Sequence, residues 1–207
     1  MQHRAQPPGA NTAGRDVRFR PPTPSDGQAL WRLAQDVGLD LNSPYAYVLW
    51  GDRFSATSVV AHRPRADGGD GTEAGGGDDE ILGYVTGFHP PGCPDVVFVW
   101  QIGVSARAQG RGLAARMLDE LLARTGARWL EATVTPSNAA SAALFSGTAR
   151  RHGTDLDRSV AYPEDLFPGG HEAEILFRIG PLGPGSPGAR AAVDGTQGAQ
   201  PQPKDVI

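Results

Sequence analysis

A glycine-rich turn between a strand and a helix constrains this sequence more than any other feature. The turn covers residues 107–114 and reads RAQGRGLA. A β-branched run at residues 96–104 precedes it, and residues 110–125 carry leucines at helical spacing. Glycines let a backbone come close to a pyrophosphate, and a helix N-terminus adds partial positive charge. The turn therefore predicts a phosphate site, with Arg107 and Arg111 adding ion pairs at its rim.

The overall charge offers no other reason for an anion to bind. Nineteen Lys and Arg residues oppose 23 Asp and Glu residues, which gives a net charge of −4. An acidic chain has no global attraction for nucleic acid or for an anionic membrane. Any anionic ligand therefore needs a local site.

The sequence also predicts a soluble cytoplasmic protein. Its longest apolar run, residues 96–100, is far too short to span a bilayer, and residues 1–15 contain no apolar signal segment. The single cysteine, Cys93, excludes an intrachain disulfide and fits a reducing compartment.

Composition divides the chain into one expected domain and two tails. Residues 1–16 and 181–207 are rich in Gly, Pro, Ala and Gln, so we expect both to be disordered. Residues 62–79 contain two runs of Gly and Asp and are expected to form a flexible inserted loop. The remaining domain spans residues 17–180.

The spacing of apolar residues predicts an α/β (α+β) domain. We expect a mixed, mostly antiparallel, twisted sheet of about six or seven strands with helices on both faces. Strands are expected at 17–20, about 54–61, 81–88, 96–104, 129–135 and 174–179; helices are expected from 23 or 25 to 38, around 40–45, at 110–125 and from 137 or 138 to 145.

The glycine turn also fits the pattern of dinucleotide-binding folds. Gly110, Gly112 and Ala115 occupy the three small-residue positions, and Glu131 lies near the expected distance downstream. However, polar residues separate the strand from the first glycine, and only two strand–helix units are available where such a fold needs more. A turn that merely caps its helix is a further alternative.

The turn, its flanks and the order of elements resemble the GNAT acetyltransferase superfamily over residues 17–180. The resemblance implies acetyl-CoA as co-substrate, with the pantetheine arm beside the strand and the pyrophosphate in the turn. The implied coenzyme contacts are Ile102, Gly103, Val104, Gln109, Gly110, Arg111, Gly112, Leu113 and Ala114. Asn138 matches an asparagine that starts the next helix in this family, and it is either a coenzyme contact or an ordinary N-cap.

Four blocks further resemble the diaminobutyrate acetyltransferases of ectoine biosynthesis. They read LDLNSPY at 39–45, FVWQIGV at 98–104, LEATVTPSN at 130–138 and DLFPGGHE at 165–172. The resemblance implies transfer of acetyl from acetyl-CoA to the γ-amino group of L-2,4-diaminobutyrate, a step towards the compatible solute ectoine. It also implies a homodimer.

This chemistry requires a group that accepts a proton. An alkyl ammonium with a pKa of about 10 is mostly charged at neutral pH, so the site must deprotonate it before the nitrogen can attack a thioester. Glu131 and His171 are the catalytic candidates, and each has a solvated surface role as its alternative.

The substrate also needs an anchor that presents one of its two amines. Asp40 is a suitable partner for an ammonium, in a loop region where binding sites often lie. Tyr45 and Trp100 are expected either to wall the substrate or to pack in the core. Thr133, on the strand face of Glu131, completes the expected substrate contacts.

One position departs from the superfamily pattern. Many members place a tyrosine in the helix after the asparagine as the acid for the leaving thiolate, whereas the matching residue here is Phe145, which we expect in the core. Another group then protonates the thiolate, or it leaves unprotonated. Phe145 also keeps open a non-catalytic acyl-CoA-binding module, and a family member acting on another small amine or a protein N-terminus is the nearer rival.

Two other mechanisms are disfavoured by the sequence. Cys93 lies in a Pro- and Gly-rich turn with no visible base, so direct transfer in a ternary complex is favoured over a covalent route. The five histidines are scattered without ligand spacing, so no metal is expected.

Overall fold

The computed structural model describes residues 17–64 and 79–183. The expected N-terminal tail, most of the expected 62–79 loop and all but the first three residues of the expected C-terminal tail lie outside these described residues. Within the described part, the first strand begins at Arg18 and the last ends at Ile179.

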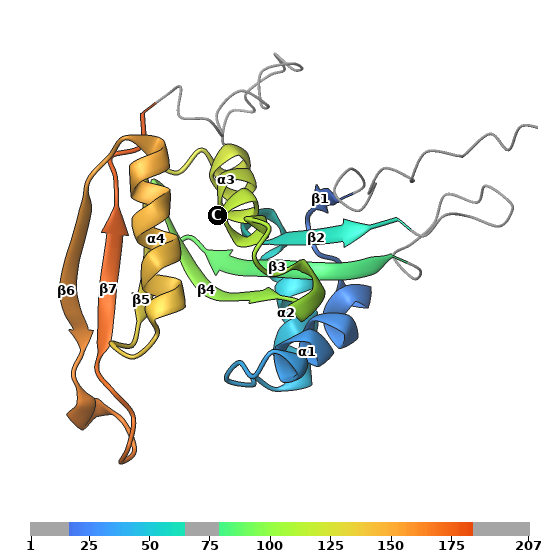
Figure 1. Ribbon diagram of the computed structural model, residues 1–207, viewed down its shortest axis with the longest axis horizontal. Coiled ribbons are helices and arrows are strands. Elements are labelled where there is room, and N and C mark those ends of the chain that lie inside the picture. The colour runs from blue at the N-terminus through green and yellow to red at the C-terminus, as the bar shows by residue number, and fades with distance from the viewer. Residues whose placement is uncertain (1–16, 65–78, 184–207) are drawn as a thin grey trace, which may run out of the picture.

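The described residues form a seven-stranded sheet with helices on both faces (Figure 1). The strand order is β1-β2-β3-β4-β5-β7-β6, and only β4 and β5 are parallel neighbours. The strands are β1 (Arg18–Arg20), β2 (Val59–Arg63), β3 (Glu80–Phe88), β4 (Val96–Val104), β5 (Trp129–Val134), β6 (Leu156–Tyr162) and β7 (Glu174–Ile179). The mixed, mostly antiparallel sheet is confirmed, and the dinucleotide-binding alternative is wrong because it needs several adjacent parallel strands.

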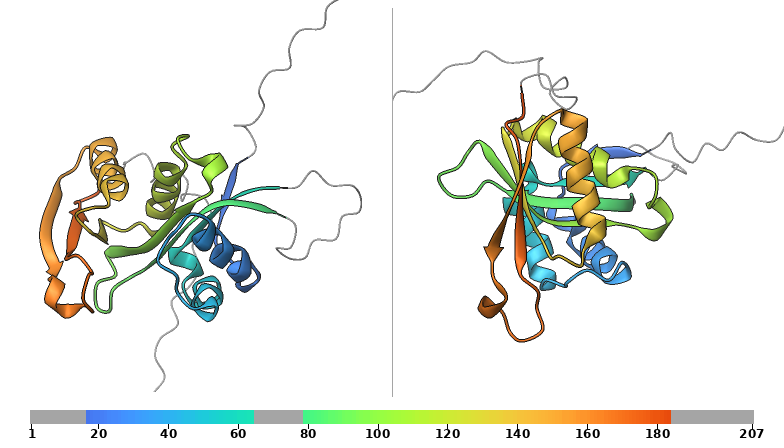
Figure 2. Two further views of the ribbon diagram at one scale, coloured as in Figure 1. Left: turned by 60° about the horizontal axis from the view of Figure 1, so that its bottom comes forward. Right: turned by 60° about the vertical axis from the view of Figure 1, so that its left-hand side comes forward.

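Four α-helices cover the sheet, two on each face (Figure 2). They are α1 (Gly27–Asp36), α2 (Pro44–Arg53), α3 (Leu113–Thr125) and α4 (Ala139–His152). One buried cluster joins α3 and α4 to the sheet, with Met117, Leu121 and Phe145 among its members. A smaller cluster joins α1 and α2 to the other face through Leu30 and Tyr47.

The structure differs from the sequence-based expectation mainly at element ends. Strand β6 was not expected, because most of its residues are exposed and show no core-facing pattern. The helix expected around 40–45 is misplaced, because residues 40–43 form a loop and α2 runs from Pro44 to Arg53. Helix α4 extends beyond the expected end at Phe145 to His152, whereas α3 begins only at Leu113, after the glycine turn. Ser55–Thr57, expected to belong to a strand, forms a 3-10 turn before β2.

No helix in residues 17–64 and 79–183 combines the length and apolar character needed to cross a membrane.

A buried carboxylate ties the first strand to the start of α1. Asp26 is 3% exposed and accepts a two-point pair from the Arg20 guanidinium at 2.7 and 2.8 Å. The Thr23 backbone N–H also donates to it, at 2.7 Å. Burial by itself raises the pKa of Asp26, but the hydrogen bonds from Arg20 and Thr23 and the charge of Arg20 outweigh it and leave the pKa lowered.

Replacing Asp26 by Asn should lower the free energy of unfolding by about 3 kcal/mol at pH 7, because the Arg20 guanidinium loses its buried charged partner. Since the pKa of Asp26 is lower in the folded chain, its stabilisation is fully present above the unfolded pKa of about 4 and is lost as pH falls through the folded pKa. Urea unfolding of both proteins at pH 7 and pH 3 measures this difference.

The stability difference should therefore shrink at the lower pH, and a difference that persists unchanged contradicts the assignment. Asp52→Asn is the matched control, because Asp52 and its partner Arg53 are both largely exposed and their pair should contribute little.

Candidate active site

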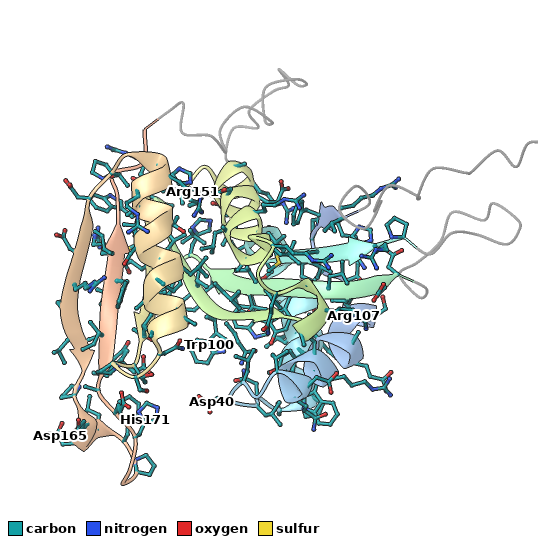
Figure 3. All side chains as sticks on the ribbon, viewed as in Figure 1. Asp40, Trp100, Arg107, Arg151, Asp165 and His171 are labelled. Atoms are coloured by element: carbon teal, nitrogen blue, oxygen red, sulfur yellow. The ribbon has the colours of Figure 1, made fainter. Side chains whose placement is uncertain are left out.

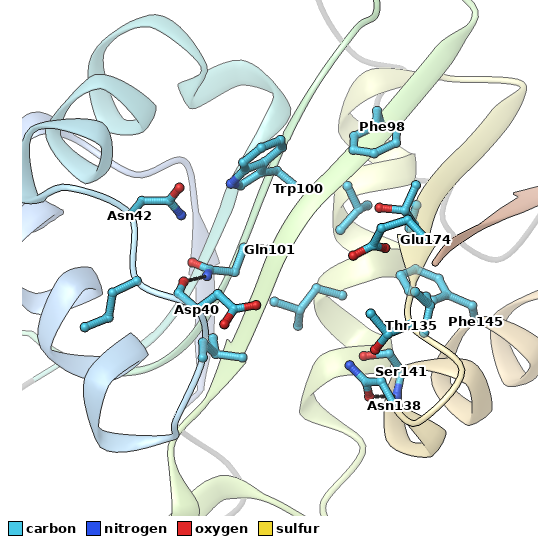
Figure 4. A pocket seen from close by; sticks show the side chains of 17 residues that line it. Asp40, Asn42, Phe98, Trp100, Gln101, Thr135, Asn138, Ser141, Phe145 and Glu174 are labelled. Atoms are coloured by element: carbon cyan, nitrogen blue, oxygen red, sulfur yellow. Dashed lines mark hydrogen bonds between the residues drawn. The ribbon is translucent and has the colours of Figure 1, made fainter. Parts of the chain in front are cut away.

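The parallel pair in the sheet separates and leaves a cavity between its two strands. β4 and β5 are paired only from Val96 opposite Trp129 to Val99 opposite Ala132. Beyond Val99, β4 continues beside β3, and β5 continues beside β7. A cavity of about 320 Å³ lies in this fork (Figure 4), lined by Leu39, Asp40, Leu41, Asn42, Phe98, Val99, Trp100, Gln101, Ile102, Ala132, Thr133, Val134, Thr135, Asn138, Ser141, Phe145 and Glu174.

A β-bulge at the fork changes which face the β4 side chains take. Gly87 of β3 lies opposite Val99 and Thr86 lies opposite Gln101, so Trp100 is the extra residue. As a result, Trp100 approaches Trp50 of α2, with ring centroids 6.4 Å apart, and Gln101 also lies towards α2. Trp100 remains 52% exposed, at the cavity mouth.

The charged side chains that line the cavity are both acidic. Asp40 comes from the loop between α1 and α2, and Glu174 begins β7. Figure 4 shows them on opposite sides of β4, with the carboxylate of each directed towards that strand. Within residues 17–64 and 79–183, no Lys or Arg lines the cavity, so its electrostatics favour a cationic ligand.

The glycine turn has the backbone conformation that a phosphate cradle requires. Gly110 and Gly112 have φ values of +72° and +69°, a region that side chains rarely tolerate. A Cβ atom on either glycine would meet no other atom within 4 Å, so the space beside the turn is open. The Gln109 side chain donates to the Val104 carbonyl at 3.1 Å and closes the turn against β4.

Arginines beside this turn supply the local positive charge that the acidic chain otherwise lacks. Arg107 and Arg111 border a hollow of about 350 Å³, together with Arg63 and Arg116. Arg107 and Arg63 both pair with Glu80, which leaves Arg111 and Arg116 without a carboxylate partner among the described residues.

Of the other expected coenzyme residues, some line the cavity and others are packed in the core. Ile102 lines the cavity, and Val104 holds the Gln109 side chain. Gly103 is buried, and a Cβ there would lie 2.7 Å from the Tyr84 ring, so close packing requires this glycine. Leu113 is a core residue of α3, and Ala114 follows it in the first turn. Asn138 is an N-cap, accepting from the Ser141 N–H at 3.0 Å, and also lines the cavity.

The two expected catalytic residues do not line the cavity. The Glu131 carboxylate pairs with Arg178 of β7, whose guanidinium lies over the Trp129 ring. His171 lies in the loop between β6 and β7, near the end of that hairpin that also carries Asp165 (Figure 3). Its ring stacks on Phe167 with centroids 4.1 Å apart, and its Nε2 lies 3.8 Å from the Glu174 carboxylate.

Three of the four expected substrate residues line the cavity. Asp40, Trp100 and Thr133 all line the cavity, although they come from three different elements. Tyr45 does not, because it projects from the first turn of α2 and is 71% exposed.

Glu174 is the functional candidate that the sequence alone did not reveal. The sequence placed a strand there, and the only signal was a carboxylate at the strand's first residue. Its access to the cavity depends on the unexpected β6–β7 hairpin and on the fork. Phe145 is 3% exposed in the core, as expected, and its ring also forms part of the cavity wall.

In residues 17–64 and 79–183, no three His, Cys, Asp or Glu side chains are grouped as a metal ligand set.

Comparison with known proteins agrees with this geometry. Residues 39–147 match the model of the acetyltransferase (GNAT) family. An L-2,4-diaminobutyric acid acetyltransferase from Halalkalibacterium halodurans is 46% identical over 167 residues, which cover 79% of this chain and 81% of that protein. The enzyme of the same name from Streptomyces avermitilis is 44% identical over 172 residues, covering 80% and 89%.

Solved structures place the fold in the same group. The diaminobutyrate acetyltransferase EctA from Paenibacillus lautus, in complex with L-2,4-diaminobutyric acid and coenzyme A, has a TM-score of 0.69 and 39% identity, covering 82% of this chain and 97% of that chain. The ribosomal-protein-S18-alanine N-acetyltransferase from Escherichia coli has the same fold, with a TM-score of 0.56 at 17% identity, covering 80% and 94%. The glycine turn, the forked sheet and these similarities together show that this chain belongs to the GNAT acetyltransferase family.

Proposed function

We propose that this protein transfers the acetyl group of acetyl-CoA to the γ-amino group of L-2,4-diaminobutyrate, giving N-γ-acetyl-diaminobutyrate for ectoine biosynthesis. The observation that carries the proposal is the fork cavity, whose lining among the described residues contains two carboxylates and no Lys or Arg. Relatives at 39–46% identity bear the name of this enzyme, and the Paenibacillus lautus structure contains this amine and coenzyme A.

The cavity charge suits this substrate. At neutral pH diaminobutyrate carries two ammonium groups and one carboxylate, so it is a net cation. Asp40 and Glu174 offer one acidic contact on each side of the cavity, which would hold the two amines in different places. The amide and hydroxyl groups of Asn42, Thr133 and Thr135 are neutral donors for the substrate carboxylate. Fixed geometry of this kind makes one amine productive.

The other arm of the fork suits acetyl-CoA, which supplies the acetyl group as an activated thioester. Beyond Val99, no strand of the described residues pairs with the edge of β4 that faces β5, so its backbone groups are available to the amides of a pantetheine chain. The open glycine turn and Arg111 follow at the end of β4 and would hold the pyrophosphate. Both substrates then meet in one cavity, as direct transfer in a ternary complex requires.

Glu174 is the best-placed residue to accept the proton of the attacking amine. Its carboxylate lines the cavity and is largely buried, whereas the Glu131 carboxylate is already paired with Arg178. His171 lies beside Glu174 and offers a path for the proton towards solvent. For the leaving thiolate, the Ser141 hydroxyl lines the cavity one helical turn before Phe145 and is the donor we propose.

The homodimer and the cytoplasmic location stay predictions. The edge strand β6 exposes the apolar side chains of Val160 and Tyr162, with Leu166 beyond it, and a second copy would cover a surface of this kind.

Incubation with acetyl-CoA should release free CoA rapidly with diaminobutyrate and slowly with lysine, ornithine or a peptide, because the two carboxylates fix the spacing of the amines. Mass spectrometry of the product should place the acetyl group on the γ-nitrogen. A preference for another amine would make the nearer rival correct. Tight acetyl-CoA binding without acetylation of any amine would support the non-catalytic module.

Replacing Glu174 by Gln should lower kcat by about 100-fold or more, because the amide keeps the shape of the side chain but cannot accept a proton. Steady-state kinetics over a range of pH measures the effect, and part of the lost rate should return as pH approaches the amine pKa of about 10. Glu131→Gln is the matched control and should retain most of the activity. The reverse ranking of the two variants would return the role of base to Glu131.

A further inference from the structure

The half-buried side-chain amide of Gln101 joins two tyrosines of the core to the loop that carries Asp40. Gln101 lies just after the β4 bulge, on the side of the sheet that faces α2. Its side chain borders the cavity, and its amide makes three hydrogen bonds to other groups of the protein. The Gln101 side chain therefore holds other parts of the protein in place.

The oxygen of this amide is fixed by two buried tyrosines. The Tyr84 hydroxyl donates to Gln101 Oε1 at 2.6 Å, and the Tyr47 hydroxyl donates to the same atom at 3.1 Å. Both tyrosines are fully buried, and their rings pack edge to face with centroids 6.3 Å apart. Burial raises the pKa of Tyr84, so its hydroxyl remains a donor. An amide oxygen has two lone pairs, and both are used here.

The nitrogen of the amide holds the loop. Gln101 Nε2 donates to the backbone carbonyl of Asp40 at 2.8 Å, across 61 residues of sequence. A carbonyl can only accept a hydrogen bond. A flip of the Gln101 amide would therefore place its oxygen against the carbonyl oxygen of Asp40. The loop between α1 and α2 has no regular secondary structure at this point, and this bond fixes it to β4.

We infer that Gln101 is a positioning residue for amine recognition, because it holds the Asp40 main chain so that the Asp40 carboxylate faces the fork cavity. The inference rests on the proposed function in assigning Asp40 to the amine. The inference predicts different effects on the two substrates, because the proposed place of acetyl-CoA is the arm of the fork formed by β4 and the glycine turn.

The test is Gln101→Glu, which keeps an oxygen for both tyrosines but places a second oxygen against the Asp40 carbonyl. Loss of this hydrogen bond should raise the KM for diaminobutyrate about tenfold. The KM for acetyl-CoA should stay within about twofold. Steady-state kinetics with each substrate varied in turn, together with the melting temperature, gives the required values.

The structural control is Thr125→Val. The Thr125 hydroxyl donates to the Leu121 carbonyl at 2.9 Å near the end of α3, so this variant also loses a hydrogen bond of the fold, but neither residue lines the cavity. It should lower the melting temperature and leave both KM values unchanged. If Gln101→Glu does not fold, Gln101→Asn replaces it under the same criteria, because the shorter side chain cannot reach both the tyrosine hydroxyls and the Asp40 carbonyl.

A double-mutant cycle gives the decisive readout. In an Asp40→Ala background, Gln101→Glu should raise the diaminobutyrate KM no further, because a positioning residue acts through the group that it positions. A second tenfold rise in that background, or a parallel rise in both KM values, would overturn the inference. If the unmodified protein prefers a different amine, the proposed substrate is wrong, and the same ratios measured with that amine still decide the role of Gln101.

Discussion

The separation of β4 from β5 is the constraint on which the rest of the structure depends. Each strand keeps an antiparallel partner on its outer side, while their shared parallel ladder ends at Val99. The two facing edges therefore carry backbone N–H and C=O groups that need partners. The proposed pantetheine contact would use these groups on β4, so the proposed coenzyme site is built first from main chain and only then from side chains. The bulge at Trp100 adds two adjacent side chains to the α2 side of the cavity.

Charge is arranged along this fork so that two oppositely charged substrates are directed to different ends. The cavity carries the carboxylates of Asp40 and Glu174, and the hollow beside the glycine turn carries Arg111 and Arg116. Field focusing by low-dielectric walls strengthens both regions, although the net charge of the chain is only −4. The polyphosphate of the proposed acyl donor and the ammonium groups of the proposed acceptor thus approach from opposite sides of one reaction centre.

Sequence reasoning succeeded where a local pattern has a local cause. The glycine turn, the amphipathic α3 and the Asn138 cap are each set by residues within one helical turn of one another, and the structure confirms them. It failed for β6, whose edge position removes the apolar alternation that marks a strand. It also placed Glu131 and Thr133 on one face of β5 correctly, yet could not show that Arg178 lies opposite Glu131 on β7 and takes up its carboxylate.

The sequence by itself determined the glycine turn, the order of most elements and the family, because these depend on residue types at short, fixed spacing. The tertiary structure decided that the Glu174 carboxylate reaches the cavity and that Gln101 holds the loop of Asp40 beside it. Glu174 enters through the β6–β7 hairpin, and Asp40 is held by Gln101 across 61 residues of sequence. Contacts of this kind depend on strand register, on one bulge and on the orientation of the Gln101 side-chain amide, none of which leaves a periodic pattern in the sequence.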